Sequence, residues 1–269
     1  MKTAVFTVIM PDYSLESAAE ELSKLGYDGV EWRVHDSYHI ALADLSARAK
    51  DVRKLCDDSG LEIAALTSYL KIHASQEIGL LLDGAGAMGA RQVRVTVPLY
   101  DRSTDYNELF DGALKDLENV QEMAAARGVK ANIEIHMGNI CPSAALAHRL
   151  VSNFDPQWVG VIYDPGNMVY EGMENWRLGM ELLGPYLAHV HLKNSKWSAE
   201  EQSDDGHVTW KPGWARMREG IVDWREVVGD LKAVGYDGYL SSEDFSDIEI
   251  AEKLKDNLEY MTELIGRKE

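Results

Sequence analysis

The sequence predicts one closed (β/α)8 barrel, a TIM barrel, that spans residues 1–269 as a single domain. Eight short apolar runs rich in β-branched residues alternate with eight segments of helical periodicity. This alternation is typical of parallel strands joined by crossover helices, and a count of eight favours a closed barrel over an open sheet. No linker, low-complexity tract or block of charge divides the chain, and barrels of about 250 residues fold as one domain.

The first half of the chain contains four predicted strand–helix units. Their strands are apolar, β-branched runs at residues 4–10, 27–33, 61–66 and 92–97. Each helix has apolar residues spaced three and four apart, and a glycine at or near its end is the stop signal. These helices are expected from the N-cap Ser14 to Gly26 and over residues 44–59, 76–88 and 106–126.

The second half repeats the pattern. Its strands are expected at residues 129–135, 159–163, 188–192 and 239–242. Its helices are expected over residues 142–153, 176–183, 223–234 and 248–265, with Pro142 or Ser143 opening the first of them.

The connection over residues 195–222 is long for a compact barrel. It spans 28 residues and contains Trp197, Trp210 and Trp214. Loops of this length are usually functional or disordered, and three tryptophans argue against disorder. We expect a loop that covers the site and excludes water, with Trp197 as the residue that contacts substrate.

The composition argues against a nucleic-acid partner, a disulfide framework and a membrane span. With 27 basic and 45 acidic residues, the formal net charge is −18, which argues against a nucleic-acid partner because phosphate is bound mainly by basic charge. Two cysteines are too few for a disulfide framework. No apolar run approaches the ~20 residues of a membrane span, and the apolar run in residues 1–13 is shorter than expected for a signal peptide. We expect a cytoplasmic protein without a membrane or nucleic-acid partner; a homo-oligomer remains open.

Metal-binding residue types stand at the ends of the last four predicted strands. These are Glu134, Asp164, His191 and Glu243. In a (β/α)8 barrel all strand carboxyl ends meet at one face, where active sites lie. Three carboxylates and an imidazole suit Mn²⁺, Mg²⁺, Co²⁺ or Zn²⁺ and leave positions for substrate oxygens. The sequence therefore predicts one divalent metal ion at this face.

Each of these four residues has an ordinary alternative role when it is taken alone. A carboxylate after a strand is often a helix cap or a surface group, and a single histidine is often a hydrogen-bonded core residue. Their recurrence on four successive strand ends favours the metal site, because like charges gathered without a cation would repel one another.

Other polar residues near the strand ends are candidate substrate contacts or structural groups. His189 and Lys193 share a face with His191 by the two-residue period of a strand, and the deeper His189 is expected in the core. Lys193 either holds a substrate oxygen or pairs with a site carboxylate, and Arg94 is expected as an ion-pair partner inside the barrel. The substrate-binding candidates are Glu31, His136, Asn167, Lys193 and Trp197.

Several of these segments resemble the xylose isomerase-like TIM barrels, a superfamily of sugar phosphate isomerases and epimerases that also includes AP endonuclease 2-like enzymes. The matching segments are Glu-Ile-His at 134–136, Asp-Pro-Gly-Asn at 164–167, His-Val-His-Leu-Lys-Asn at 189–194, Ser-Ser-Glu-Asp at 241–244 and the stretch 219–224. The resemblance implies that the four strand-end residues bind one divalent cation, and that Glu134 and Glu243 flank the substrate carbon and move protons. Many members have a histidine where this chain has Asn167.

The leading functional interpretation is a metal-dependent isomerase or epimerase of a sugar or polyol ketone, active in carbohydrate metabolism. A metal ion would hold a carbonyl and a neighbouring hydroxyl oxygen, and one glutamate would remove the intervening proton while the other returns it through an enediolate. A lyase that dehydrates a hydroxy-ketone on the same scaffold is the alternative. A non-catalytic sugar-binding barrel is the third interpretation.

Overall fold

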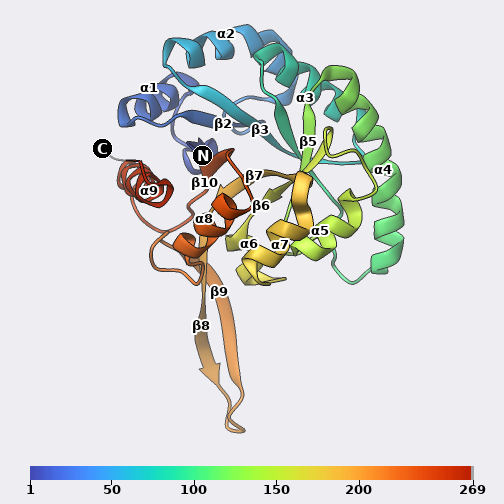
Figure 1. Ribbon diagram of the computed structural model, residues 1–269, viewed down its shortest axis with the longest axis vertical. Coiled ribbons are helices and arrows are strands. Elements are labelled where there is room, and N and C mark those ends of the chain that lie inside the picture. Colours follow the sequence, from blue (N-terminus) through green and yellow to red (C-terminus); the bar gives the residue numbers. More distant parts are fainter. Residues whose placement is uncertain (268–269) are drawn as a thin grey trace.

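The computed structural model describes residues 1–267 and confirms the predicted barrel (Figure 1). Eight parallel strands close in the order β1-β10-β7-β6-β5-β4-β3-β2. The barrel strands are β1 (Lys2–Phe6), β2 (Gly29–Arg33), β3 (Glu62–Lys71), β4 (Gln92–Thr96), β5 (Lys130–Glu134), β6 (Val159–Tyr163), β7 (Leu187–Leu192) and β10 (Tyr239–Ser242).

Helices surround the barrel and cover the outer face of its strands (Figure 1). They are α1 (Leu15–Leu25), α2 (Leu45–Asp58), α3 (Ser75–Met88), α4 (Tyr106–Arg127), α5 (Ala144–Val151), α6 (Pro165–Tyr170), α7 (Trp176–Leu183), α8 (Trp224–Ala233) and α9 (Ile250–Ile265). Ser14 and Ser17 form a reciprocal capping box at the start of α1, and Gly26 ends it at φ 96°, in the left-handed region that glycine adopts without a steric penalty. No helix of residues 1–267 is long and apolar enough to cross a membrane.

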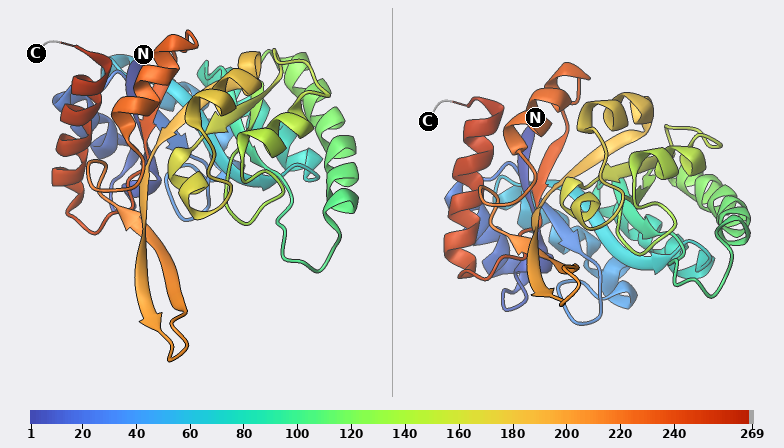
Figure 2. Two further views of the ribbon diagram at one scale, coloured as in Figure 1. Left: turned by 60° about the horizontal axis from the view of Figure 1, so that its bottom comes forward. Right: turned by 90° about the horizontal axis from the view of Figure 1, so that it is seen from below.

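The long connection after β7 is not the expected loop. It folds into an antiparallel hairpin of β8 (Asn194–Gln202) and β9 (Val208–Ala215), which extends away from the barrel in Figures 1 and 2. The segment alternates tryptophan or small apolar residues with polar ones and contains Gly206 in its turn at φ 87°. Such alternation is typical of a strand, but the segment was predicted as a loop because of its length.

The end of the first strand and a helix that was not predicted also differ from expectation near the mouth of the barrel. The first strand ends at Phe6 and continues as a 3-10 turn over Thr7–Ile9. After β6, Pro165 ends strand pairing but also occupies the first turn of α6, with Asp164 as its N-cap. Proline is favoured there because its missing N–H is not needed in the first turn of a helix.

Candidate metal centre

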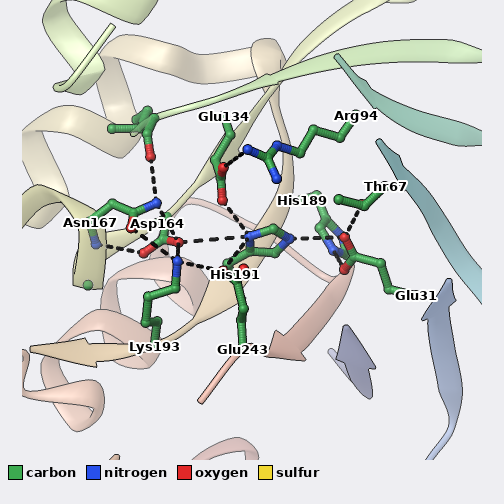
Figure 3. Close-up of polar contacts among 12 residues, drawn as sticks. Glu31, Thr67, Arg94, Glu134, Asp164, Asn167, His189, His191, Lys193 and Glu243 are labelled. Carbon is green, nitrogen blue, oxygen red and sulfur yellow. Dashed lines mark hydrogen bonds and ion pairs between the residues drawn. The ribbon is translucent and has the colours of Figure 1, made fainter. Parts of the chain in front are cut away.

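Four predicted ligands lie together at the carboxyl end of the barrel (Figure 3). Glu134, Asp164, His191 and Glu243 each offer one ligand atom, and these atoms all lie within 4.8 Å of one another. Tyr163 pairs with Val190 in the sheet, so Asp164 and His191 stand at the same level on neighbouring strands. None of the four is more than 4% exposed.

The imidazole of His191 points its Nδ1 atom at the three carboxylates. Nδ1 lies 2.7 Å from Oε1 of Glu134, 3.4 Å from Oε2 of Glu243 and 3.8 Å from Oδ2 of Asp164. Two ligands on opposite sides of one ion are at most about 4.4 Å apart, since each metal–ligand bond is about 2.0–2.2 Å. The four atoms therefore need to move only slightly to surround one divalent cation.

Two buried cations balance part of the negative charge. Arg94 lies 2.7 Å from Oε2 of Glu134, which confirms its predicted role inside the barrel. Nζ of Lys193 lies 2.5 Å from Oε2 of Glu243 and 2.9 Å from Oδ2 of Asp164. Lys193 was expected either to pair with a site carboxylate or to hold a substrate oxygen. These distances show the ion pairs, and the contact with substrate remains a prediction.

Burial and these cations give the carboxyl groups different acidities. Burial raises the pKa of Asp164 above its usual range even though Lys193 opposes the shift. Burial acts in the same direction on Glu134 and Glu243, but it is outweighed by the neighbouring positive groups taken together. Arg94 and His191 lower the pKa of Glu134, and Lys193 and His191 lower that of Glu243. The two glutamates are thus held as carboxylates, the form that accepts a proton.

Glu31 lies beneath the centre rather than at the open mouth, which corrects its predicted contact with substrate. It is fully buried, and Oε1 accepts hydrogen bonds from His191 Nε2 at 3.0 Å and from the Thr67 hydroxyl. Oε2 lies 2.8 Å from Nε2 of His189, a core histidine as expected. Burial raises the pKa of Glu31, but the facing histidines hold it well below its usual range.

Asn167 is a positioning residue in this structure, not an open substrate contact. Its backbone N–H donates to Oδ1 of Asp164 at 2.8 Å, and its side-chain Nδ2 donates to Oδ2 at 2.9 Å. The amide oxygen accepts from Lys193 at 3.0 Å. With no exposed surface, Asn167 fixes Asp164 from both sides.

The remaining substrate candidates lie around the mouth. His136 is partly exposed just after β5, with Nδ1 2.6 Å from the Met137 carbonyl oxygen. Trp197 donates from its indole to Val169 in α6 at 2.7 Å. Trp214 was named with the other two tryptophans of this connection but not as the residue that contacts substrate. Its ring lies 5.2 Å from Nζ of Lys193.

A sizeable cavity lies elsewhere. It has a volume of about 930 Å³ and opens at the amino-terminal end of the barrel, where Lys2, Glu62, Gln92 and Tyr239 line it. We assign the chemistry to the carboxyl end instead, because the four-ligand cluster is there and size alone does not supply reactive groups.

Comparisons with known proteins agree with this architecture. The model of the family described as Xylose isomerase-like TIM barrel matches residues 19–264. An inosose dehydratase of Geobacillus thermodenitrificans is 25% identical over 278 residues, covering 95% of this chain and 91% of that protein. Among solved structures, the IOLI protein with a binding zinc atom has a TM-score of 0.77 at 16% identity and 99% coverage of each chain. D-psicose 3-epimerase in the presence of D-fructose has a TM-score of 0.76 at 16% identity, covering 99% of this chain and 100% of that one.

Proposed function

We propose that this chain, which belongs to the xylose isomerase-like TIM barrel family, is an enzyme that uses one divalent metal ion to move a proton next to the carbonyl of a sugar or polyol ketone. The observation that carries the proposal is the buried cluster of three carboxylates and one imidazole at the mouth of the barrel. The structural relative with a binding zinc atom supports a divalent ion on this scaffold.

Glu134, Asp164, His191 and Glu243 would hold the ion. Bound there, it supplies Lewis acidity to a carbonyl and a neighbouring hydroxyl oxygen of the substrate, which acidifies the C–H bond between them. Arg94 and Lys193 keep the two glutamates ionised and in place.

Glu134 and Glu243 would transfer protons from different sides of the substrate. Glu134 ends β5 and Glu243 follows β10, and β6 and β7 lie between these strands in the barrel. One carboxylate can therefore remove the proton from one face of a planar enediolate, and the other can return a proton to the opposite face. This geometry favours an epimerase or isomerase.

Dehydration of a hydroxy-ketone is a second candidate that a specific similarity favours. The inosose dehydratase aligns with 95% of this chain. Both reactions would begin with removal of the same proton, and dehydration would then require protonation of the departing hydroxyl group. The two candidates differ only in the fate of the carbanion.

Product analysis in D₂O separates these reactions. The metal-loaded protein is incubated with a panel of ketoses and inososes, and products are identified by NMR and mass spectrometry. Epimerisation or isomerisation incorporates solvent deuterium at the reacting carbon, dehydration yields a product lighter by one water, and a hydride shift incorporates no deuterium. A protein that binds metal and ketoses but turns over none of them would contradict the enzyme and favour a sugar-binding barrel.

A further inference from the structure

A second group of polar side chains lies at the mouth of the barrel, on the strands opposite those that carry the four predicted ligands. Arg33 ends β2, Thr96 ends β4, and Tyr69 and Lys71 lie in the last residues of β3. In the sheet Arg33 pairs with Thr67, and Lys71 pairs with Thr96. Because β2, β3 and β4 are neighbours in the closed barrel (Figure 1), these residues stand along one wall of the mouth.

The side chains of this wall face the inside of the barrel. Successive residues of a strand point to opposite faces, so residues two apart share a face. Glu31 lies in the barrel interior, and Arg33 follows it by two residues on the same strand. The Thr67 hydroxyl donates to Glu31 from the interior face of β3, and Tyr69 and Lys71 continue that face towards the mouth.

Tyr69 joins this wall to the candidate metal centre. The centroid of its ring lies 5.4 Å from Cζ of Arg33 and 4.9 Å from Cζ of Arg94. Arg94 in turn lies 2.7 Å from Oε2 of Glu134, the pair drawn in Figure 3. Burial lowers the pKa of Lys71, and the nearby charge of Arg94 lowers it further. A substrate held at the metal centre would therefore have this wall beside it.

Arg33 and Lys71 form no ion pair with a carboxylate among residues 1–267. The Arg33 guanidinium lies over the ring of Tyr38, with Cζ 4.1 Å from the ring centroid, and Nη1 donates to the Ser37 hydroxyl at 3.4 Å. Stacking on an aromatic ring orients a guanidinium without neutralising its charge. In a chain of net charge −18, two cations without acidic partners at the mouth are a local surplus of positive charge.

Buried donors on the same wall also lack partners. Nε of Arg33, Nε of Arg94 and the hydroxyl of Thr96 are shielded from solvent and form no hydrogen bond with the described residues. The whole Arg94 side chain is buried, with 4% of the residue exposed. Buried polar groups are almost always hydrogen-bonded, and a guanidinium can only donate. A ligand that satisfies this wall must therefore bring acceptor oxygens.

The charges of the neighbouring metal centre do not use up this surplus. A divalent ion, together with Arg94 and Lys193, would balance the three carboxylates of the centre and that of Glu31 beneath it. Arg33 and Lys71 would then remain without counter-charge on the substrate side. Opposite charge on a ligand favours binding at such a place, and a neutral ligand gains nothing from it.

We propose that Arg33, Lys71 and Thr96 bind an anionic group of the substrate, a carboxylate or a phosphate, while the substrate carbonyl lies at the metal centre. The inference rests on the proposed function and narrows its substrate class to acidic or phosphorylated ketones. Arg33 offers a planar fork of N–H donors that matches the oxygens of either group. Lys71 adds a positive charge, and the Thr96 hydroxyl donates a further hydrogen bond.

Three ligands that differ at one carbon test the preference for charge. D-Fructose, D-fructuronate and D-fructose 6-phosphate share the same carbonyl and neighbouring hydroxyl groups, and their terminal carbon carries a hydroxyl, a carboxylate or a phosphate. Their dissociation constants are measured by calorimetry at low salt with protein loaded with one equivalent of zinc. We expect one of the two anions to bind about tenfold more tightly than fructose, through charge-assisted hydrogen bonds, and the tighter one identifies the group. Added salt should reduce the preference.

Substitutions in the wall locate the preference. Arg33→Gln and Lys71→Gln each remove one positive charge and keep a polar side chain. We expect each to weaken binding of the preferred anion about five- to tenfold, as for the loss of a hydrogen bond between charged groups, and to leave the affinity for fructose unchanged. Arg91→Gln is the matched control, because it removes the same charge from an exposed side chain at the amino-terminal end of the barrel. Lys71 is partly exposed, so its variant serves if Arg33→Gln does not fold.

Three results would overturn the proposal. The first is equal affinity for the three ligands, or no binding of either anion. The second is an anion preference that persists in both wall variants, which would place the anion on the metal ion itself. The third is an equal loss in Arg91→Gln, which would indicate only the general field of the protein. Binding is measured without turnover, so a protein that turns over none of the ketones contradicts the proposed function alone, and turnover of neutral ketoses without any anion preference contradicts this inference alone.

Discussion

The two halves of the barrel contribute to the centre in different ways. Strands β5, β6, β7 and β10 carry the four predicted ligands at their carboxyl ends. Strands β1 to β4 supply the groups around and beneath them, and these are Phe6, Glu31, Thr67, Gln92 and Arg94. The ligand half thus presents the ligand atoms together with Lys193 and Asn167, which hold Asp164 and Glu243. The other half supports the centre from beneath and pairs Arg94 with Glu134, so substitutions in the two halves should have different effects.

The largest effect is expected in the ligand half. His191→Ala removes the nitrogen ligand, and Asp164→Asn replaces a charged oxygen by a neutral one. We expect metal content, measured by elemental analysis after dialysis against a chelator, to fall from about one ion per chain to near zero in both, because each change removes or neutralises one of the four protein ligands and metal affinity depends on the number and charge of the ligands. Full occupancy in both variants would refute the assignment.

In the supporting half, Arg94→Met should act on stability. It leaves Glu134 buried without its ion-pair partner, and both side chains are at most 5% exposed. Breaking such a pair typically costs about 3–5 kcal/mol, which urea denaturation of the metal-free protein would measure. A loss of less than about 1 kcal/mol, as found for surface pairs, would show that Glu134 does not depend on this half of the barrel.

Substitutions of the proposed acid–base residues, Glu134 and Glu243, should lower the rate of turnover more than they lower stability. Glu134→Gln and Glu243→Gln keep the shape of the side chains but remove the group that accepts a proton. We expect kcat to fall by a factor of about 10² or more in each, while the free energy of unfolding changes less than in Arg94→Met. Exposed Glu118 on α4 provides the control Glu118→Gln, and equal activity in all three variants would exclude the proton-transfer role.

The smallest predicted effect on activity comes from substitutions in the hairpin of β8 and β9. Trp214 stands over Lys193 and packs against Tyr170 and Phe245, whereas Trp210 is 57% exposed further along the hairpin. Trp214→Ala should lower kcat/KM roughly fivefold, the equivalent of about 1 kcal/mol for a lost cation–π contact. Trp210→Ala should leave it unchanged, and the opposite ranking would place the functional contact at the tip.

The sequence predicted the fold and the ligand half better than the supporting half. Strand-end residues such as Asp164 and Glu243 interrupt a clear apolar pattern, and the barrel topology then brings them together. Thr67 gave no comparable signal, because the predicted third strand ended at residue 66, whereas β3 continues to Lys71. Gln92 is the first residue of the predicted fourth strand, where a polar residue is ordinary. The link from Gln92 through His189 to Glu31 joins different strands through side-chain geometry, which periodicity along one strand does not encode.

Glu31 and Trp197 illustrate the same limit. Both stand at positions that sequence spacing places near the mouth, yet Glu31 points into the barrel interior and Trp197 bonds to α6. The direction of a side chain at a strand end depends on the local turn and on its partners. In this chain Trp214, not Trp197, is the hairpin residue against Lys193.

The central claim is that one divalent ion is bound by Glu134, Asp164, His191 and Glu243. Anomalous diffraction from crystals grown with Mn²⁺ tests it most directly, because it locates the ion without reference to activity. We predict a single anomalous peak within bonding distance of one atom from each of these four residues. A peak between Glu31 and His189, or none at the mouth when Mn²⁺ is in excess, would contradict the account.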